Sequence, residues 1–151
     1  MTFTATIPGD PRGKGSVRVY NGRAMKDAKT AEYMTRAILA FQSAADGWTR
    51  LDGPWWGDLR CFVDRPARLI PKAKARTAQP PSDAFVAPCK PDVDNVAKAV
   101  LDALVQAGIV ADDKACVSLR VRKFYAAVGD SPEVRVALGS VGEWSLTAED
   151  R

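Results

Sequence analysis

The stretch KPDVDNVAKAVLDALVQAG, residues 90–108, decides the fold around which the rest of the chain is organised. Its apolar residues recur at a spacing of three and four, which buries one face of an α-helix. They are Val93, Val96, Ala97, Val100, Leu101, Leu104 and Val105. Gly108 then supplies a common helix stop. The sequence therefore predicts an amphipathic helix that begins near Asp92 and ends before Gly108.

Charged residues occupy the other side and both ends of this predicted helix. Asp92 and Asp94 stand at its start, and Asp94, Lys98 and Asp102 follow one another four residues apart, so they share one edge. The acidic pair 112–113 comes just after the helix. Each group has an ordinary explanation: helix capping for the first two aspartates, a surface ion ladder for Lys98, and a turn for the acidic pair.

Length and composition describe one soluble globular domain. The chain has 151 residues, of which 46% are hydrophobic and 26% charged, enough for one core and too few for two ordinary domains. We expect a single domain over residues 1–138 and a loosely held tail over 139–151. No signal peptide and no apolar run long enough to span a membrane is apparent, so the expected location is the cytoplasm, with no membrane partner.

The cysteine and histidine counts exclude several kinds of chemistry. The three cysteines, Cys61, Cys89 and Cys116, are widely separated and form no C-x-x-C pair, which argues against a disulfide framework and a thiolate zinc site. The chain contains no histidine, so it lacks the commonest general base and every Ser-His or Cys-His nucleophile. Any catalysis must depend on carboxylates, lysine, water and hard metal ions.

Basic residues are clustered, although the formal net charge is only +4. One cluster lies in the N-terminal quarter (Arg12, Lys14, Arg18, Arg23, Lys26 and Lys29), and another lies in the middle (Arg65, Arg68, Lys72, Lys74 and Arg76). Either alone is equally well explained as a solvated surface. Two clusters beside a group of carboxylates favour a polyanion, and nucleic acid is the obvious candidate. The glycines around Lys14 do not have the Walker spacing, so no nucleotide cofactor is expected.

The remaining elements predict a fold of the α/β class, of α+β type, with two main helices on a small mixed or antiparallel sheet. Alternating apolar residues predict strands over 2–7, 17–20, 59–63, 117–121 and 134–138. We expect the last two to form an antiparallel pair. A second helix is expected from an N-cap at Thr30 to about Asp46, with a buried stripe of Tyr33, Ala37, Ala40, Phe41 and Ala44.

Two stretches are harder to assign to an element. Residues 51–57 are interpreted as a turn whose two tryptophans, Trp55 and Trp56, cover a core edge more readily than they stack on bases. Residues 64–90 contain five prolines and are expected to form a long basic loop. Loops of that length within a compact domain are usually functional or disordered.

The aspartates suggest metal chemistry when they are considered together. Two carboxylates about 5 Å apart repel by roughly 3 kcal/mol at an effective dielectric near 20, so a cluster of Asp92, Asp94 and Asp113 requires a cation. Oxygen ligands without His or Cys select Mg²⁺ or Mn²⁺. Phosphodiester hydrolysis by metal-activated water uses such a site, and Lys98 lies one turn from Asp94 to reach the scissile phosphate.

A family resemblance supports this interpretation. The string KPDVDNVAKAVLDAL, followed by Gly108-Ile-Val, Asp112-Asp113 and Val117, closely resembles the signature of RusA-like endodeoxyribonucleases, the Holliday junction resolvases often carried by phages and prophages. Weaker agreement extends over most of the chain. It includes Gly13-Lys14-Gly15, Thr30, Tyr33, Gly53-Pro54, Pro71-Lys72 and Lys123-Phe-Tyr125.

The resemblance implies a homodimer with a Mg²⁺-dependent site that nicks two strands of a four-way junction symmetrically in recombination and repair. Position by position, it implies catalytic roles for Asp92, Asp94, Lys98 and Asp113. The same three aspartates would bind Mg²⁺, with Mn²⁺ as a substitute and Asp112 in support. The residues expected to contact branched DNA are Arg12, Lys14, Arg18, Lys72, Lys74, Arg76 and Lys90.

Two alternatives remain open from the sequence. A catalytically silent module would bind branched DNA through the same basic surfaces while the acids only cap and solvate. A small-molecule phosphohydrolase with a D-x-D motif is weaker, because that class needs an apolar strand running into the first aspartate, and Lys90-Pro91 stands there instead.

Overall fold

A computed structural model describes residues 1–13, 18–20, 23–25, 28–70 and 86–143, with side chains in all of these ranges except 18–20 and 23–25. Within them, no helix is both long enough and apolar enough to cross a membrane. The expected DNA contacts Lys14, Lys72, Lys74 and Arg76 lie outside the described residues, as do the predicted turn at 21–22 and most of the expected tail. The side chain of Arg18 is outside them as well.

The centre of the molecule is a four-stranded mixed sheet in the order β1-β6-β4-β5. Its strands are β1 (Thr2–Pro8), β4 (Trp55–Val63), β5 (Cys116–Tyr125) and β6 (Glu133–Ser140). Strand β6 lies antiparallel between β1 and β4, whereas β5 runs parallel to β4 at one edge. The α+β fold with a mixed sheet is therefore confirmed.

The expected antiparallel pairing of the last two strands is wrong. Strand β6 inserts between β1 and β4 and buries Val134, Val136 and Leu138 almost completely, which suits a central strand. The alternate residues of β5 are only half-buried, as befits an edge. Apolar alternation shows which face of a strand is buried, but it does not identify the neighbouring strand.

Strand β4 starts earlier than expected, because the tryptophan pair belongs to it. The side chain of Trp55 is 0% exposed and packs in the core, so the turn interpretation was wrong, while the expected core role is confirmed for this residue. Trp56 points to the other side of the sheet and is half-buried. Adjacent residues of a strand point to opposite faces, so the two indoles face different surroundings.

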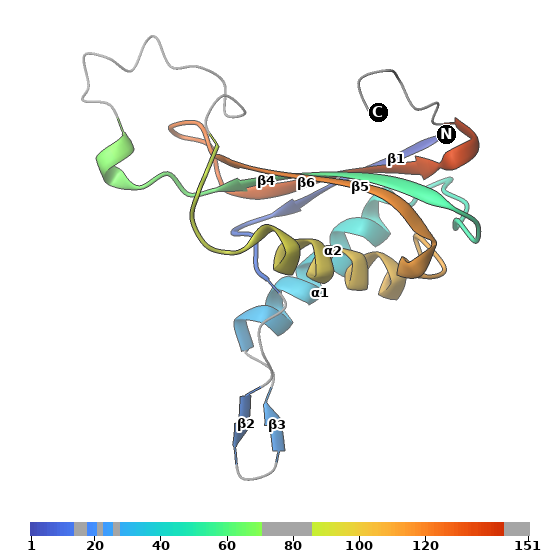
Figure 1. Cartoon of the computed structure of the whole chain (residues 1–151), viewed down its shortest axis with the longest axis horizontal. Helices are drawn as coiled ribbons and strands as arrows, with labels where there is room; N and C mark the ends of the chain where they lie inside the picture. The colour runs from blue at the N-terminus through green and yellow to red at the C-terminus, as the bar shows by residue number, and fades with distance from the viewer. Residues whose placement is uncertain (14–17, 21–22, 26–27, 71–85, 144–151) are drawn as a thin grey trace.

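Both long helices, α1 (Ala28–Ala44) and α2 (Val93–Gln106), cover the same face of the sheet (Figure 1). Helix α1 buries Tyr33, Ala37 and Phe41, as its spacing predicted, but the prediction is wrong for Ala44, which is exposed as the last residue of the helix, and Ala40 is only half-buried. Thr30 is its third residue, so the predicted N-cap is wrong. Helix α2 closely matches its predicted bounds, and Gly108 follows it in the left-handed conformation with φ of 74°.

Short elements complete the described chain. A two-stranded hairpin of β2 (Arg18–Tyr20) and β3 (Arg23–Met25) extends from the helix side of the body, which confirms the predicted strand and hairpin (Figure 1). Single-turn 3₁₀ helices are η1 (Ala67–Leu69), η4 (Asp113–Ala115) and η5 (Val141–Glu143). Cys61, Cys89 and Cys116 are free thiols.

Candidate active site at the two ends of helix α2

Helix α2 is firmly mounted, which fixes the positions of the charged groups at its start. Six of its residues are buried against the sheet and α1: Val96, Ala97, Ala99, Val100, Ala103 and Leu104. Val93 was expected in the same stripe but is 38% exposed. Burial of an aliphatic side chain contributes about 1.5–3 kcal/mol, so this face holds the helix in one orientation.

The capping explanation does not account for Asp92. Asp92 occupies the N-cap position, and its backbone carbonyl accepts a hydrogen bond from the Val96 amide at 3.1 Å. Its carboxylate, however, makes no capping hydrogen bond to the helix. Asp94 lies in the first turn, and both side chains are exposed. The helix start therefore presents two accessible carboxylates beside the positive end of the helix dipole.

Lys98 reaches back one turn to Asp94, and its Nζ lies 3.3 Å from Oδ2 of that carboxylate. The side chains of Lys98 and Asp94 are 61% and 67% exposed. Ion pairs this exposed typically contribute 0–1 kcal/mol, so a cation or a phosphate can displace this contact at small cost. The charged edge of α2 thus brings an ammonium and a carboxylate together, and both groups stay free to exchange partners.

Gly13 packs directly on the start of helix α2. A Cβ at Gly13 would lie 2.7 Å from Cβ of Asn95, closer than side-chain carbons pack, so only glycine fits this approach. Gly13 follows Arg12, which is half-buried. Arg12, one of the predicted DNA-binding residues, therefore stands one residue before the point where the chain packs on the first turn of α2.

A lysine that the sequence analysis did not assign to the site supports it from the sheet. Lys123 of β5 donates hydrogen bonds from Nζ to the Pro91 carbonyl at 2.7 Å and to the Cys89 carbonyl. These carbonyls belong to the segment that leads directly into Asp92. The sequence did contain a hint of this role. Lys123 occupies the next position in the alternation of Leu119 and Val121, where a third apolar residue would be expected.

A hollow of about 480 Å³ opens beside this segment. It is lined by Pro88, Cys89, Lys90, Asp92, Val93 and Lys123. Lys90, predicted to contact DNA, is exposed at its wall. A carboxylate and two ammonium groups thus share one accessible depression, which suits a phosphate accompanied by a cation.

The far end of α2 leads to the acidic pair. The Trp55 indole N–H donates to the backbone carbonyl of Asp112 at 3.2 Å, so the buried tryptophan fixes this turn. The Asp112 carboxylate accepts from the Lys114 amide at 3.0 Å and pairs with Lys114 Nζ at 2.6 Å. Hydrogen bonding from Lys114 holds the pKa of Asp112 below its ordinary value. Asp113, at the start of η4, is exposed.

The structure does not bring the three predicted metal ligands together within one chain. A helix of 14 residues is about 21 Å long at 1.5 Å per residue, and the chain reaches Asp113, the first residue of η4, only after the end of α2 opposite Asp92 and Asp94. Among the described residues, no group of three or more Cys, Asp or Glu side chains is placed to hold one metal ion. Asp92, Asp94 and Lys98 form one half of the predicted site, and Asp113 stands apart.

Comparison with known proteins places the chain in a family. The family model for endodeoxyribonuclease RusA matches residues 8–138, which include both ends of α2. This chain belongs to the RusA endodeoxyribonuclease family. It is also 30% identical over 141 residues to a protein of Bacillus subtilis (strain 168) described as the uncharacterized protein YqaN, covering 90% of this chain and 94% of that one.

Membership in the RusA family points to an endodeoxyribonuclease, a hydrolase that acts on DNA. The RusA family acts on branched DNA, which implies that this chain binds DNA. The described site is consistent with that class, because its exposed carboxylates and lysines are the groups that phosphodiester hydrolysis uses.

The donor set also fits the divalent cation expected for such a nuclease. Asp92 and Asp94 offer only hard carboxylate oxygens, which suit Mg²⁺ or Mn²⁺ better than zinc. The Asp92 carboxylate is not used for capping, and Asp94 makes only an exposed ion pair. Two such groups in one chain are a partial ligand set, and Mg²⁺ commonly completes its shell with water and phosphate oxygens.

Proposed function

We propose that this chain is a Mg²⁺-dependent, structure-selective endonuclease that acts as a homodimer and resolves four-way DNA junctions by paired symmetric nicks. The observation that carries the proposal is the pair of exposed carboxylates on Asp92 and Asp94 at the start of a helix whose other face is buried, with Lys98 paired to Asp94 and Lys90 lining the same hollow as Asp92. RusA family membership supplies the reaction class.

The proposed homodimer explains how Asp113 can act together with Asp92 and Asp94 although they lie far apart within one chain. Asp113 lies past the opposite end of α2, so within one chain it is too far away to share a cation with Asp92 and Asp94. A two-fold axis relates every residue of one subunit to the same residue of the other. The site is complete if the partner subunit's Asp113 approaches the start of α2, and symmetry then gives two equivalent sites for two nicks.

Strand β5 offers a route to this arrangement. It begins at Cys116, three residues after Asp113, and ends near Lys123, whose ammonium contacts the segment before Asp92. It is an edge strand, and among the described residues only Val86 bridges its outer side, at Phe124. Two such edges placed antiparallel across a two-fold axis bring the start of one β5 to the end of the other.

The residues of the chain then have distinct proposed roles. Asp92 and Asp94 hold the cation and are oriented by the buried face of α2. Mg²⁺, when bound, makes water a better nucleophile and offsets charge developing on the phosphate. Lys98 exchanges its contact with Asp94 for the scissile phosphate and stabilises its negative charge. Arg12 and Lys90 hold the DNA backbone on either side, so that the phosphorus lies near the carboxylates.

The direct test is cleavage of a synthetic four-way junction in the presence of Mg²⁺. We expect paired nicks placed symmetrically about the branch. Asp94→Asn should lower the rate by about a thousandfold or more, because loss of a metal ligand removes several kcal/mol of transition-state stabilisation. Asp102→Asn, two turns along the same helix edge, is the matched control and should cut at nearly the wild-type rate.

The same assay separates this function from the catalytically silent alternative. A silent branched-DNA-binding module would bind the junction and leave both strands intact in Mg²⁺ and in Mn²⁺. That result from the wild-type protein would overturn the nuclease proposal while leaving DNA binding in place.

A further inference from the structure

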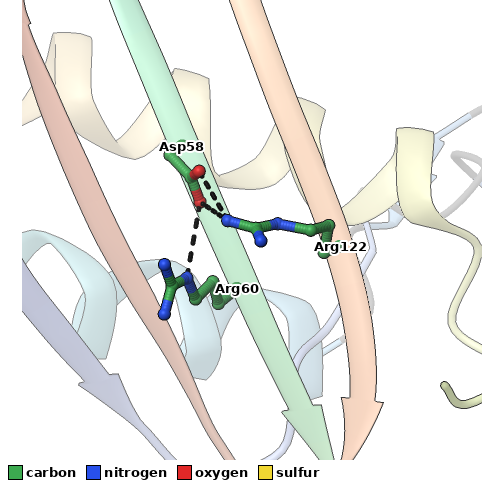
Figure 2. Close-up of polar contacts among 3 residues, drawn as sticks. All are labelled: Asp58, Arg60 and Arg122. Atoms are coloured by element: carbon green, nitrogen blue, oxygen red, sulfur yellow. Dashed lines mark hydrogen bonds and ion pairs between the residues drawn. The ribbon is translucent and has the colours of Figure 1, made fainter. Parts of the chain in front are cut away.

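The face of the sheet that points away from α1 and α2 carries a row of arginines. Arg60 of β4 lies directly opposite Arg135 of β6 and Arg122 of β5, so the three side chains project from neighbouring strands at one level. Figure 2 shows Arg60 and Arg122 on this side of the sheet, with the helices behind it. We call this the arginine row. None of the described helices covers it (Figure 1).

Such a row costs the folded protein stability. Like charges placed directly opposite on neighbouring strands are destabilising. Here they are only partly neutralised. Asp58 accepts from Arg122 Nη2 at 2.7 and 3.0 Å and lies 3.8 Å from Arg60, as Figure 2 shows. Arg135 pairs with Glu133 at 2.6 Å.

The charge that remains on this face is positive and held in fixed positions. The three guanidinium groups of the arginine row stand against the carboxylates of Asp58 and Glu133 and leave a net charge of +1. The guanidinium of Arg135 also lies over the Phe62 ring, 4.6 Å from its centroid. Arginines held by a neighbouring ring or carboxylate lose little freedom on binding an anion.

A shallow hollow of about 630 Å³ adjoins the arginine row. Its charged and polar walls are Thr4, Thr6, Asp58, Arg60 and Arg135, with Trp56 at one side. The indole of Trp56 lies against Gly139, where a Cβ would come 3.1 Å from Nε1. Hydroxyl groups and guanidinium groups around one depression are the donors that contact phosphate oxygens in protein–DNA interfaces.

We propose that the arginine row and its hollow bind the phosphodiester backbone of a DNA arm other than the one being cut. The inference rests on the proposed function, because it assumes a branched DNA substrate. Branched DNA leaves the cleavage point in several directions, and this face lies on the opposite side of the sheet from α2. Its positive charge complements DNA phosphate.

A second copy of the chain fits this face less well. Two copies stacked face to face would bring one net positive surface against another, with arginine against arginine. Stable homodimer interfaces are rich in apolar contacts. Among the described residues, the large exposed apolar side chains are Met1, Leu39, Leu69, Ile70, Val86, Val93 and Val117, and none of them lines the hollow or belongs to the arginine row.

The test measures junction binding by the uncut complex, using Asp94→Asn as the parent protein across a salt titration. Adding Arg60→Gln and Arg135→Gln should weaken binding at least tenfold and lower the slope of log K against log salt by about two, one for each lost phosphate contact. Arg60→Glu alone should weaken binding further than Arg60→Gln. Arg50→Gln is the control: Arg50 is exposed, pairs with Asp52 and lies off this face, so affinity and slope should not change.

The outcomes separate the two proposals. Junction affinity and slope equal to those of the parent, with the melting temperature unchanged, would overturn the arginine-row inference and leave the proposed function standing. A shift of the double variant from dimer to monomer in sedimentation would assign the face to a contact between copies and would also overturn it. Failure of the parent itself to bind a junction would remove the proposed function together with this inference.

Discussion

The two ends of helix α2 carry the same residue type in different surroundings. At its start, Asp92 and Asp94 are exposed, a loop packs through Gly13, and Lys123 holds the entering segment. At its far end, the Asp112 carboxylate is paired with Lys114, whereas Asp113 is exposed. The start is built as a site, whereas the end presents a single carboxylate on a turn.

This difference explains why a motif that is compact in sequence does not give a compact site in one chain. The buried face of α2 keeps its two ends about 21 Å apart, as 14 residues of α-helix require. Among the described residues, neither end brings three carboxylates or thiols together around one position. A symmetric pair of chains can place one end of each helix beside the other end of its partner, and this is the arrangement that we propose.

The largest expected effect comes from removing Asp113, the residue that the single chain leaves far from the rest. If the two ends act in one site, Asp113→Asn should lower junction cleavage as severely as Asp94→Asn, by about a thousandfold or more. Asp112→Asn should have a much smaller effect, because Asp112 already pairs with Lys114. The measurement is the single-turnover rate of junction cleavage at saturating protein. Equal rates for wild type and Asp113→Asn would show that the far end of α2 takes no part in the site.

Lys123 tests whether the start of α2 needs its support from β5. Lys123→Met removes a charged donor to two carbonyls, a contribution of about 1.5–3 kcal/mol per hydrogen bond to a charged group. We expect a 10- to 100-fold slower cleavage and a higher Mg²⁺ concentration for half-maximal rate. Lys123→Arg should recover part of both. A lower melting temperature with an unchanged Mg²⁺ requirement would show that the lysine only stabilises the fold.

Gly13 tests the packing of the loop on the helix. Gly13→Ala places a Cβ 2.7 Å from Asn95, and overpacking of this kind costs about 1–3 kcal/mol. The loop should shift away from Asp94, and junction cleavage should fall about tenfold. Gly53→Ala is the matched control, because a Cβ at Gly53 meets no atom within 4 Å. Equal cleavage by the two variants would mean that the loop does not contribute to the site.

The smallest expected effect is a change in the pKa of Asp112, at the far end of α2, and a pH titration detects it. Lys114→Gln removes the partner that lowers the pKa of Asp112, so that pKa should rise toward its ordinary value. A depressed carboxyl pKa stabilises the fold above its ordinary range, and this contribution is lost as the pH falls through the folded pKa. The variant should show less of that acid dependence, because the backbone amide of residue 114 still donates to Asp112. A carboxyl NMR titration measures the change, and an unmoved Asp112 pKa would contradict the assignment of its partner.

The sequence predicted local structure well because local structure follows from spacing. The three-and-four spacing gave α2, and alternation gave the strands, including the buried Val134, Val136 and Leu138. Pairing partners could not be predicted in the same way. The parallel contact of β4 with β5 joins residues about sixty positions apart, and a pattern of alternation is the same whichever strand lies beside it.

The same limit applied to part of the site. Asp94 and Lys98 are one turn apart and Asp92 stands two residues before Asp94, so their proximity could be predicted from helix geometry, and Lys98 does contact Asp94. Asp113 follows the predicted helix that begins at the other two aspartates, so its separation from them could have been predicted, and the expected cluster of three aspartates overlooked the length of that helix. Lys123 was missed for a different reason: its contacts with the Cys89 and Pro91 carbonyls exist only after the sheet has formed.

The central claim is that each site combines the start of α2 from one chain with the partner subunit's Asp113. It is tested most directly by a heterodimer of Asp94→Asn and Asp113→Asn chains, coexpressed with two different affinity tags and purified through both. One of its two sites then contains every intact carboxylate. We predict single nicks in the junction at about half the wild-type rate, as two-fold symmetry requires. A heterodimer as inactive as either parent variant would place all the carboxylates of a site in one chain and contradict the claim.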